Sequence, residues 1–224
     1  MLPVSQPLLF FRREPLTSNN MSGDRYQEKR DFRRTPEPRG EGKRGKGHKQ
    51  PVFVIQQHDA STLHFDFRLE VDGVLRSWAV PKGPSTDPAE KRLAIPTEDH
   101  PLDYADFEGV IPEGEYGAGP VLIWDRGTYR NRSEKDGESR SMAAALDDGH
   151  AVAELYGEKL SGGYALQRIG QGDDTRWLLV KTDDEHADAR RNPVSTQQES
   201  VASGRTLDEI RADADADDRG KDNE

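Results

Sequence analysis

The 224-residue sequence predicts a mainly-β protein, a compact antiparallel β-barrel of about eight strands with minor helices. Between residues 52 and 181, short runs rich in β-branched and aromatic residues alternate with Gly and Pro turns. Helical periodicity is almost absent there, except around residues 139–149. Strands that recur at intervals of about 10–20 residues favour a closed or partly closed barrel over a sandwich.

The first fifty residues differ from this region in composition. They contain 12 Lys and Arg against 6 Asp and Glu, and residues 28–50 are rich in Arg, Lys, Gly and Pro. We therefore expect residues 1–26 to form a disordered extension and residues 27–50 a mobile basic arm. Such an arm suggests a polyanionic partner, although a solubilising tail would have the same composition.

The first three strands are predicted at residues 52–58, 63–71 and 74–80. Residues 63–70, LHFDFRLE, alternate apolar and polar side chains with the period of two that is typical of a strand. Asp72 and Gly73 separate the second and third runs and form the strongest short signal for a hairpin turn. We expect these two strands to pair antiparallel.

Five further runs complete the predicted barrel, at residues 92–98, 120–129, 151–160, 162–170 and 176–182. Residues 108–120 contain four glycines and two prolines, which predicts a loop. This loop lacks the Gly-Lys-Ser/Thr ending of a phosphate-cradling nucleotide loop. Residues 183–224 contain 6 Lys and Arg against 13 Asp and Glu and end in repeated Ala-Asp steps, so we expect an acidic disordered tail.

The composition excludes several classes of protein. The chain has no cysteine, so it has neither a disulfide framework nor a thiolate metal site, and any metal must be held by His and carboxylate groups. No stretch approaches a membrane span, and the short apolar run near the start is a poor signal peptide. We expect a cytoplasmic protein that is a monomer and has no membrane partner.

The polar face of residues 63–71 carries the candidate site. His64, Asp66 and Arg68 lie two residues apart, roughly 7 Å from one another along a strand. His58 precedes His64 by six residues, which places it on the same face if the strand continues unbroken. Two imidazoles and a carboxylate with open positions can bind Mn²⁺, Fe²⁺ or Zn²⁺, and we expect them to project into the barrel. A hydrogen-bonded His–Asp pair beside a surface His would use the same residues.

Basic and proton-donating residues follow this group along the chain. Arg68 beside a metal is suited to grip a phosphate, or it neutralises Asp66. Lys82 stands in a Pro-Lys-Gly-Pro turn. Residues 91–110 add Arg92, Glu98, His100 and Tyr104. Together these groups suit a phosphoryl centre, although each alone is also typical of a surface or capping position.

Three long motifs occur in a fixed order. They are QQHDASTLHFDFRLEVDGVLRSWAVPKGPS at residues 56–85, KRLAIPTEDHPLDYADFEGVIPEGEYGAG at residues 91–119, and VLIWDRGTY at residues 121–129. Flanking matches extend the similarity to EKRDFRRTPEP upstream and RWLLVKT downstream, over about residues 27–182. These motifs resemble the 3′-phosphoesterase module of bacterial DNA ligase D, which also occurs as a free-standing protein.

The resemblance implies a compact β-barrel that uses a divalent metal, typically Mn²⁺ with Zn²⁺ or Co²⁺ as alternatives. The family acts on the 3′ ends of DNA or RNA–DNA primers, removing a terminal ribonucleoside and then a 3′-phosphate to leave a 3′-hydroxyl. By motif, the implied metal ligands are His58, His64 and Asp66. The implied contacts of the reacting phosphate are Arg68, His100 and Tyr104, with His100 either protonating the departing oxygen or binding phosphate as an imidazolium.

Other matched positions are those that the family uses around its site. They are Lys82, Arg92, Glu98 and, in the arm, Arg30, Asp31 and Glu37. The arm match implies a segment that folds over the active site, so residues 27–50 would be partly ordered and belong to a domain of residues 27–182.

The absence of a ligase Lys-x-Asp-Gly motif predicts a free-standing phosphoesterase whose ligase and polymerase partners are separate polypeptides. Two other interpretations remain. One is a non-catalytic protein of the same fold that binds nucleic-acid ends. The other is a cupin-like metal dioxygenase, which also uses His and carboxylate ligands on a barrel.

Overall fold

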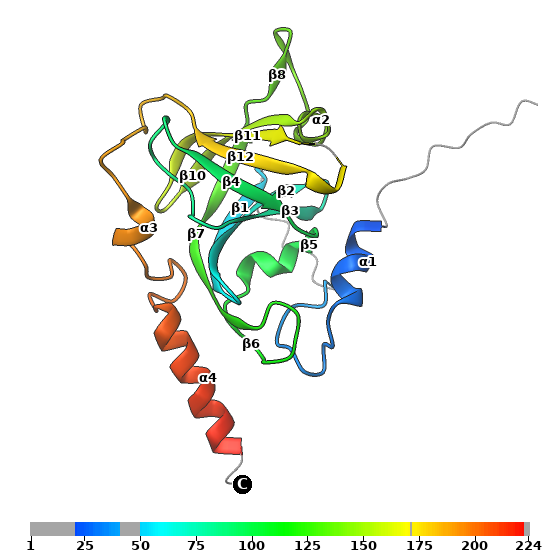
Figure 1. The fold of residues 1–224 in the computed structure, drawn as a ribbon, viewed down its shortest axis with the longest axis vertical. Coiled ribbons are helices and arrows are strands. Elements are labelled where there is room, and N and C mark those ends of the chain that lie inside the picture. The colour runs from blue at the N-terminus through cyan, green and yellow to red at the C-terminus, as the bar shows by residue number, and fades with distance from the viewer. Residues whose placement is uncertain (1–20, 41–49, 171, 222–224) are drawn as a thin grey trace, which may run out of the picture.

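The computed structural model describes residues 21–40, 50–170 and 172–221, so the expectation for residues 1–20 lies outside the described residues. Eight antiparallel strands close into a barrel, as predicted (Figure 1). Each strand pairs with the next in this order, and the last pairs with the first: β1 (Val52–Asp59), β2 (Leu63–Val71), β3 (Val74–Val80), β4 (Lys91–Pro96), β12 (Arg176–Lys181), β11 (Ser161–Ile169), β10 (His150–Gly157) and β7 (Gly119–Asn131).

These eight strands coincide with the eight runs predicted from the sequence. Four short strands lie outside the ring: β5 (His100–Pro101), β6 (Gly109–Ile111), β8 (Glu134–Lys135) and β9 (Glu138–Ser139). The helices are α1 (Met21–Glu28), η1 (Leu102–Asp106), α2 (Met142–Asp148), η2 (Gly172–Asp174), α3 (Pro193–Thr196) and α4 (Leu207–Lys221). The described part of the chain contains no helix that is both long enough and apolar enough to cross a membrane.

The predicted hairpin between β2 and β3 is present. Asp72 and Gly73 both have positive φ, 50° and 86°, as the two central residues of a type I′ hairpin turn require. The register then pairs Arg68 with Ser77 and Asp66 with Ala79. The polar face of β2 therefore continues onto β3.

The molecule has two apolar cores, one on each side of the barrel wall. Phe53, Ile55, Phe65 and Phe67 belong to the larger core, which fills the barrel. A second core covers the outside of the wall and includes Val54, Leu75, Ile123, Tyr26 and Tyr104. Segments that lie outside the barrel, among them α1, η1 and β6, supply the cover (Figure 1).

Both ends of the described chain are more ordered than composition predicts. In α1, Tyr26 is 1% exposed, which corrects the expected disorder of residues 21–26. The expected disordered tail is likewise corrected for residues 183–210, where Ile210 is 3% exposed and joins the barrel core. The Trp124 indole N–H donates to the Gln197 carbonyl at 2.7 Å. A few well-placed apolar residues anchor a segment whose average composition is polar.

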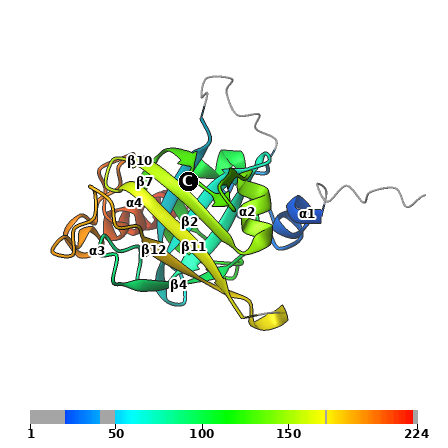
Figure 2. The same cartoon turned by 90° about the horizontal axis from the view of Figure 1, so that it is seen from above.

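The two anchored ends lie on different sides of the barrel. α1 packs near β5, whereas α4 contacts β7 and β6. Figure 1 and Figure 2 both place α1 and α3 at opposite flanks of the barrel. The candidate site described below lies on the α1 side.

Candidate metal centre and phosphate site

The three predicted metal ligands come from one hairpin. His58 of β1 pairs directly with His64 of β2, and Gln56 pairs with Asp66. The chain therefore reverses between the two histidines, as the two separate predicted strands allow, and the unbroken strand considered as one route to a shared face is absent. His58 still shares the face of His64 because directly opposed residues of an antiparallel pair point to the same side.

That shared face is the outer face of the barrel wall. The neighbours of Asp66 on β2 are Phe65 and Phe67, which lie in the barrel core, so Asp66 points the opposite way. The expectation that the site projects into the barrel is therefore wrong. The site stays sheltered because residues of α1, η1 and the loop after β6 cover this part of the wall.

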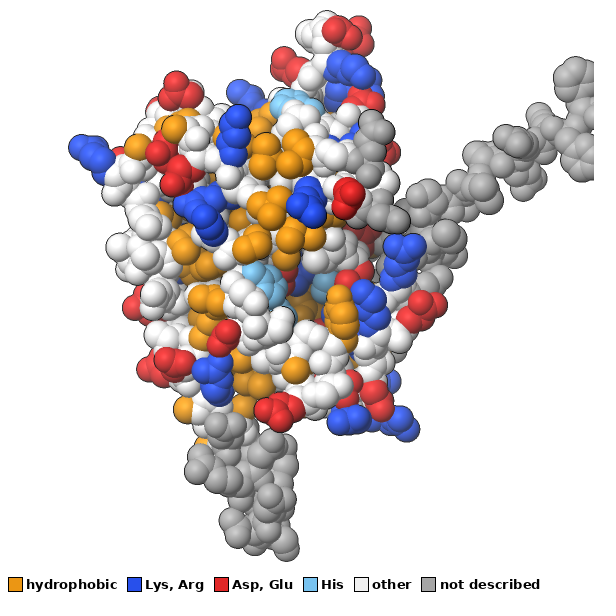
Figure 3. Space-filling view, viewed as in Figure 1, with side chains coloured by type: hydrophobic (Ala, Val, Ile, Leu, Met, Phe, Trp, Pro, Cys, Tyr) orange, Lys and Arg blue, Asp and Glu red, His pale blue; other side chains and the backbone are white. Residues whose placement is uncertain are grey.

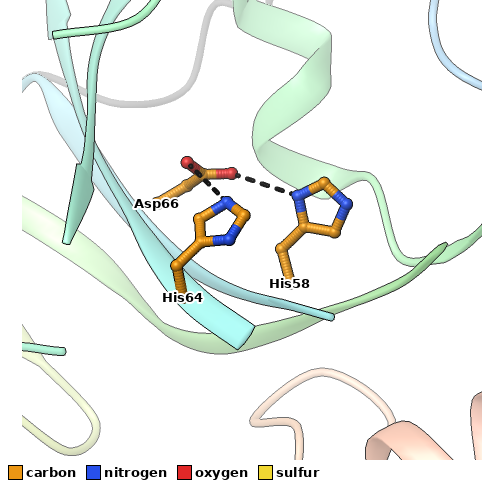
Figure 4. Close-up of side chains that lie close together, drawn as sticks. All are labelled: His58, His64 and Asp66. Atoms are coloured by element: carbon orange, nitrogen blue, oxygen red, sulfur yellow. Dashed lines mark ion pairs between the residues drawn. The ribbon is translucent and has the colours of Figure 1, made fainter. Parts of the chain in front are cut away.

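The ligand atoms of the three residues converge. One candidate atom from each residue lies within 4.8 Å of the others. His58 Nδ1 is 3.7 Å from Asp66 Oδ2, and His64 Nε2 is 3.6 Å from Asp66 Oδ1 (Figure 4). His58 and Asp66 are buried and His64 is half-buried.

Backbone carbonyls orient both imidazoles. His58 Nε2 lies 2.7 Å from the Gly117 carbonyl, and His64 Nδ1 lies 2.8 Å from the Thr62 carbonyl. A carbonyl only accepts, so these two nitrogens carry the hydrogens of the neutral rings. The lone pairs of His58 Nδ1 and His64 Nε2 then face the Asp66 carboxylate. Three electron-rich groups that converge in this way fit a divalent cation, and fixing of the distal ring nitrogen is typical of His ligands.

Arg68 organises the floor of the site. Its side chain is nearly fully buried, with Nε donating to Gln56 Oε1 at 2.8 Å and Nη1 to Ser77 Oγ at 2.9 Å. Its Nη2 donates to Asp66 Oδ2 at 2.8 Å. Burial alone would raise the pKa of Asp66, but the Arg68 guanidinium outweighs it and holds that pKa below its usual range. The carboxylate therefore stays ionised.

His100 lies against Arg68. Its Nδ1 is 2.9 Å from Arg68 Nη1 and 2.9 Å from the Glu98 carbonyl. Burial, together with the charges of Arg68 and Arg30, lowers the pKa of His100 well below its ordinary value. The lowered pKa favours the neutral imidazole in the free protein, and a bound anionic phosphate would raise it again.

Tyr104 closes the next side of the site. Its ring lies 4.6 Å from the His100 ring and 5.0 Å from the Arg68 guanidinium carbon. The phenol O–H donates to Glu37 Oε1 at 3.1 Å, and burial raises the pKa of Tyr104 well above its ordinary value. Tyr104 therefore stays protonated and is held by a residue of the arm.

The arm is ordered where it reaches the site. Arg30 Nε donates to Glu37 Oε1 at 2.8 Å, and Arg30 Nη1 donates to Glu98 Oε1 at 3.3 Å. All three side chains are at most 6% exposed. Lys29 adds an ion pair to Glu98 Oε2 at 3.1 Å. The described part of the arm is therefore fixed to the barrel wall by buried charge pairs, as the resemblance implied.

A cavity of about 270 Å³ joins these groups. The three ligand residues line it together with Arg30, Arg68, Glu98, His100 and Tyr104. Figure 3 shows His side chains in a hollow of this face, with hydrophobic and basic groups at its edges. The geometry brings a candidate cation site and two guanidinium groups into one small space, which suits an oxyanion of high charge.

Comparison with known proteins identifies the family. Residues 56–168 match the family model of the DNA ligase D 3′-phosphoesterase domain. The chain belongs to this family.

Curated relatives agree with this assignment. The multifunctional non-homologous end joining protein LigD of Pseudomonas aeruginosa is 50% identical over 185 residues, which cover 81% of this chain and 21% of that protein. The LigD DNA repair protein of Mycobacterium tuberculosis is 49% identical over 154 residues, covering 69% and 19%. LigD of Mycolicibacterium smegmatis is 44% identical over 164 residues, covering 71% and 20%. The chain thus spans about a fifth of the length of the curated relatives it matches.

The structure of this phosphoesterase-family chain does not bring every predicted residue into the cavity. Lys82 and Arg92 line a separate cavity of about 330 Å³, where Arg92 pairs with Glu90. Asp31 lies outside both, and hydrogen bonds from the Arg33 side chain and amide lower its pKa to about 2. Asp31 begins a turn, since its carbonyl accepts a hydrogen bond from the Arg34 amide at 2.8 Å.

Sequence reasoning missed several residues of the site. Gln56 shares the outward face of His58, so the alternation of β1 could have revealed it. Ser77 could have been found by extending the β2–β3 register. Tyr116 and Gly117 lie in a Gly- and Pro-rich loop, where no periodic pattern indicates which side chains face the family's metal centre.

Proposed function

We propose that this chain is a metal-dependent phosphoesterase that acts on the 3′ ends of DNA or RNA–DNA strands. It would remove a 3′-terminal ribonucleoside and a 3′-phosphate, leaving a 3′-hydroxyl. One observation carries the proposal: two imidazole lone pairs and an ionised carboxylate converge beside a buried guanidinium in one cavity. Membership of the DNA ligase D 3′-phosphoesterase domain family supports it.

The metal would be held by His58 Nδ1, His64 Nε2 and Asp66. These nitrogen and oxygen donors suit Mn²⁺, the ion that the family resemblance implies, as well as Zn²⁺ or Co²⁺. When bound, the ion supplies positive charge that polarises a phosphate oxygen.

The protein's own groups would bind the other phosphate oxygens. Arg68 Nη2 carries two hydrogens, of which one donates to Asp66, so the second can donate to a phosphate oxygen. Arg30 lines the same cavity and adds a second positive charge. In the removal of a 3′-phosphate, His100, neutral in the free protein, would gain a proton beside the phosphate dianion and could then pass it to the departing 3′ oxygen.

The biological setting is proposed from the relatives. Their names assign them to non-homologous end joining, a form of DNA repair. We propose that this chain also acts in end joining, where it would prepare 3′ ends for a polymerase or ligase. The matched region gives no ligase or polymerase activity to this chain, so those steps would come from other domains or polypeptides.

A primer assay tests the proposal. Purified protein is incubated with Mn²⁺ and a labelled DNA primer that ends in a 3′-phosphate, or in one ribonucleotide, and product mobility is followed on a gel. We expect both ends to be converted to a 3′-hydroxyl, with no conversion in chelator. Binding without conversion would favour the non-catalytic end-binding protein. A reaction that requires O₂ would instead favour the dioxygenase.

A further inference from the structure

An exposed aromatic side chain stands at the mouth of the metal cavity. Tyr116 is 50% exposed and lines the cavity together with the metal ligands. Within the described residues, the large aromatic side chains exposed to this degree are Tyr116 and Tyr156, and Tyr156 does not line this cavity. The exposed part of the ring offers a flat, largely apolar surface to a ligand in the cavity.

The loop that carries Tyr116 is tied to the metal centre. The next residue, Gly117, gives its carbonyl to His58 Nε2 at 2.7 Å. The loop is closed by amide-to-carbonyl bonds from Glu115 to Pro112 and from Ala118 to Glu115, both 3.2 Å. The position of the Tyr116 backbone is therefore fixed relative to the ligands.

Two basic residues of the arm contact the Tyr116 ring. Lys29 Nζ lies 4.3 Å from the centre of the Tyr116 ring and 3.3 Å from its hydroxyl. The same ammonium pairs with Glu98, a residue of the cavity wall. The guanidinium carbon of Arg30 lies 5.7 Å from the centre of the same ring. The two cations keep the ring oriented, and half of its surface stays exposed at the cavity mouth.

We infer that Tyr116 is the stacking platform for a nucleobase, namely the base of the nucleotide whose 3′ oxygen bears the reacting phosphate. The inference rests on the proposed function. A flat aromatic face beside a phosphate site is how sequence-tolerant nucleic-acid proteins hold single strands, because every base has a π-face. Both proposed reactions cleave at a phosphate on the 3′ side of one nucleotide, so the same base would occupy the platform in both.

The test compares Tyr116→Ala with Tyr116→Phe and with Tyr156→Ala, a matched exposed tyrosine away from the cavity. Each variant is assayed on a 3′-phosphate primer that has either a normal base or an abasic sugar at the terminal nucleotide. On the normal primer, we expect Tyr116→Ala to raise KM roughly 5- to 100-fold with little change in kcat. Tyr116→Phe and Tyr156→Ala should resemble the wild type.

The abasic primer separates stacking from loop damage. If Tyr116 stacks on the base, the wild type should lose affinity for the abasic end, and Tyr116→Ala should lose nothing further. An unchanged KM in Tyr116→Ala, or an equal loss on both primers, would overturn the inference. Mn²⁺ affinity, measured by calorimetry, should be the same in Tyr116→Ala and the wild type if the His58–Gly117 contact is intact.

Failure of the proposed function would look different. A wild-type protein that converts neither primer would reject the phosphoesterase proposal and leave primer binding to be measured. The Kd values of the wild type and the three variants for both primers would then decide the platform: selective weakening by Tyr116→Ala on the normal primer supports it, and equal binding by all variants rejects it.

Discussion

At the scale of single residues, the proposed metal centre uses two backbone carbonyls as well as three side chains. Thr62 fixes His64 from within the turn that joins β1 and β2, and Gly117 fixes His58 from a distant loop. Gly117 has φ of +76°, and a Cβ there would lie 3.4 Å from His58 Cε1. That distance is an ordinary contact, but a residue other than glycine would be strained at this positive φ, so conformation favours glycine at position 117.

His64→Ala tests the metal centre with little risk to the fold. His64 is half-buried and its ring is held by one backbone carbonyl, so we expect unfolding free energy to change by less than about 1 kcal/mol. Activity on a 3′-phosphate primer should fall more than about 100-fold, because loss of a ligand exceeds the usual effect of losing an outer partner. The exposed His150 provides the control, and His150→Ala should keep full activity. Full activity in folded His64→Ala would exclude the proposed ligand set.

The carboxylate of Asp184 should make the stability of the fold depend on pH. Burial alone would raise its pKa, but hydrogen bonds from Lys181, the Gly163 amide and Thr182 lower it from 3.8 to about 2. Since the folded-state pKa lies below the unfolded one, the stabilisation is complete above about pH 4 and disappears as the pH falls through 2. It is worth about 1–2 kcal/mol, because the carboxylate is 29% exposed and water screens part of the interaction.

The experiment compares urea unfolding of the wild type and Asp184→Asn at several pH values. We expect the variant to be less stable at pH 7, and the difference to shrink between pH 4 and pH 2. Asp183→Asn, one residue away, serves as the control and should not show this pH dependence. If the difference in unfolding free energy between the wild type and Asp184→Asn stays constant with pH, the charge of Asp184 does not stabilise the fold.

At the scale of elements, the β1–β2 hairpin shows what alternation can and cannot reveal. The period of two separated Phe65 and Phe67 from Asp66 and Arg68, and this part of the prediction is confirmed. Alternation cannot tell which face lies inside the barrel when both faces are buried. Here the outer face is covered by segments far away in the sequence, such as the one that carries Tyr104. The inward position expected for the site was wrong for this reason.

The C-terminal helix α4 contradicts the composition of its own segment. Leu207 and Ile210 are three residues apart and therefore lie on one face, where they pack against the barrel core. We expect Ile210→Ala to lower the unfolding free energy by about 2–4 kcal/mol, since it removes a fully buried side chain. Thermal or urea unfolding of the variant and the wild type measures this difference in unfolding free energy.

Ala212 provides a control on the same helix. It is exposed, so Ala212→Ser should change stability by only about 0.5 kcal/mol. Equal stability of Ile210→Ala and the wild type would mean that α4 is not anchored to the barrel and that the acidic segment behaves as composition suggests.

At the scale of the whole molecule, the strands were predictable because each carries its own periodic signal. The surroundings of the site were not, because they depend on contacts between segments without such a signal. Lys82 and Arg92 illustrate this: they are near the ligand residues in sequence, but the turn after β3 carries them to another cavity. Arg30 and Glu37 are farther away in sequence. Arg30 nevertheless lines the ligand cavity, and Glu37 accepts the hydroxyl hydrogen of Tyr104, which lines the same cavity.

The two cores suggest that the protein divides into a barrel that holds the metal and an arm that completes the phosphate site. No described residue of the arm belongs to the barrel core, whereas Phe32 of the arm and Tyr26 of the preceding helix α1 pack in the outer one. The three ligands and both orienting carbonyls come from residues 58–117. Metal binding should therefore survive loss of the arm, while turnover should not.

A chain that begins at residue 50 tests this division against one that begins at residue 21. We expect the shorter chain to keep its β-sheet circular dichroism and to bind Mn²⁺ with nearly unchanged affinity in calorimetry. Its phosphatase activity should fall at least about 100-fold, because Arg30 is lost and Tyr104 loses the Glu37 carboxylate that holds its hydroxyl. Retained activity would show that the arm is dispensable. Loss of Mn²⁺ binding together with activity would show instead that the arm and the wall form one indivisible site.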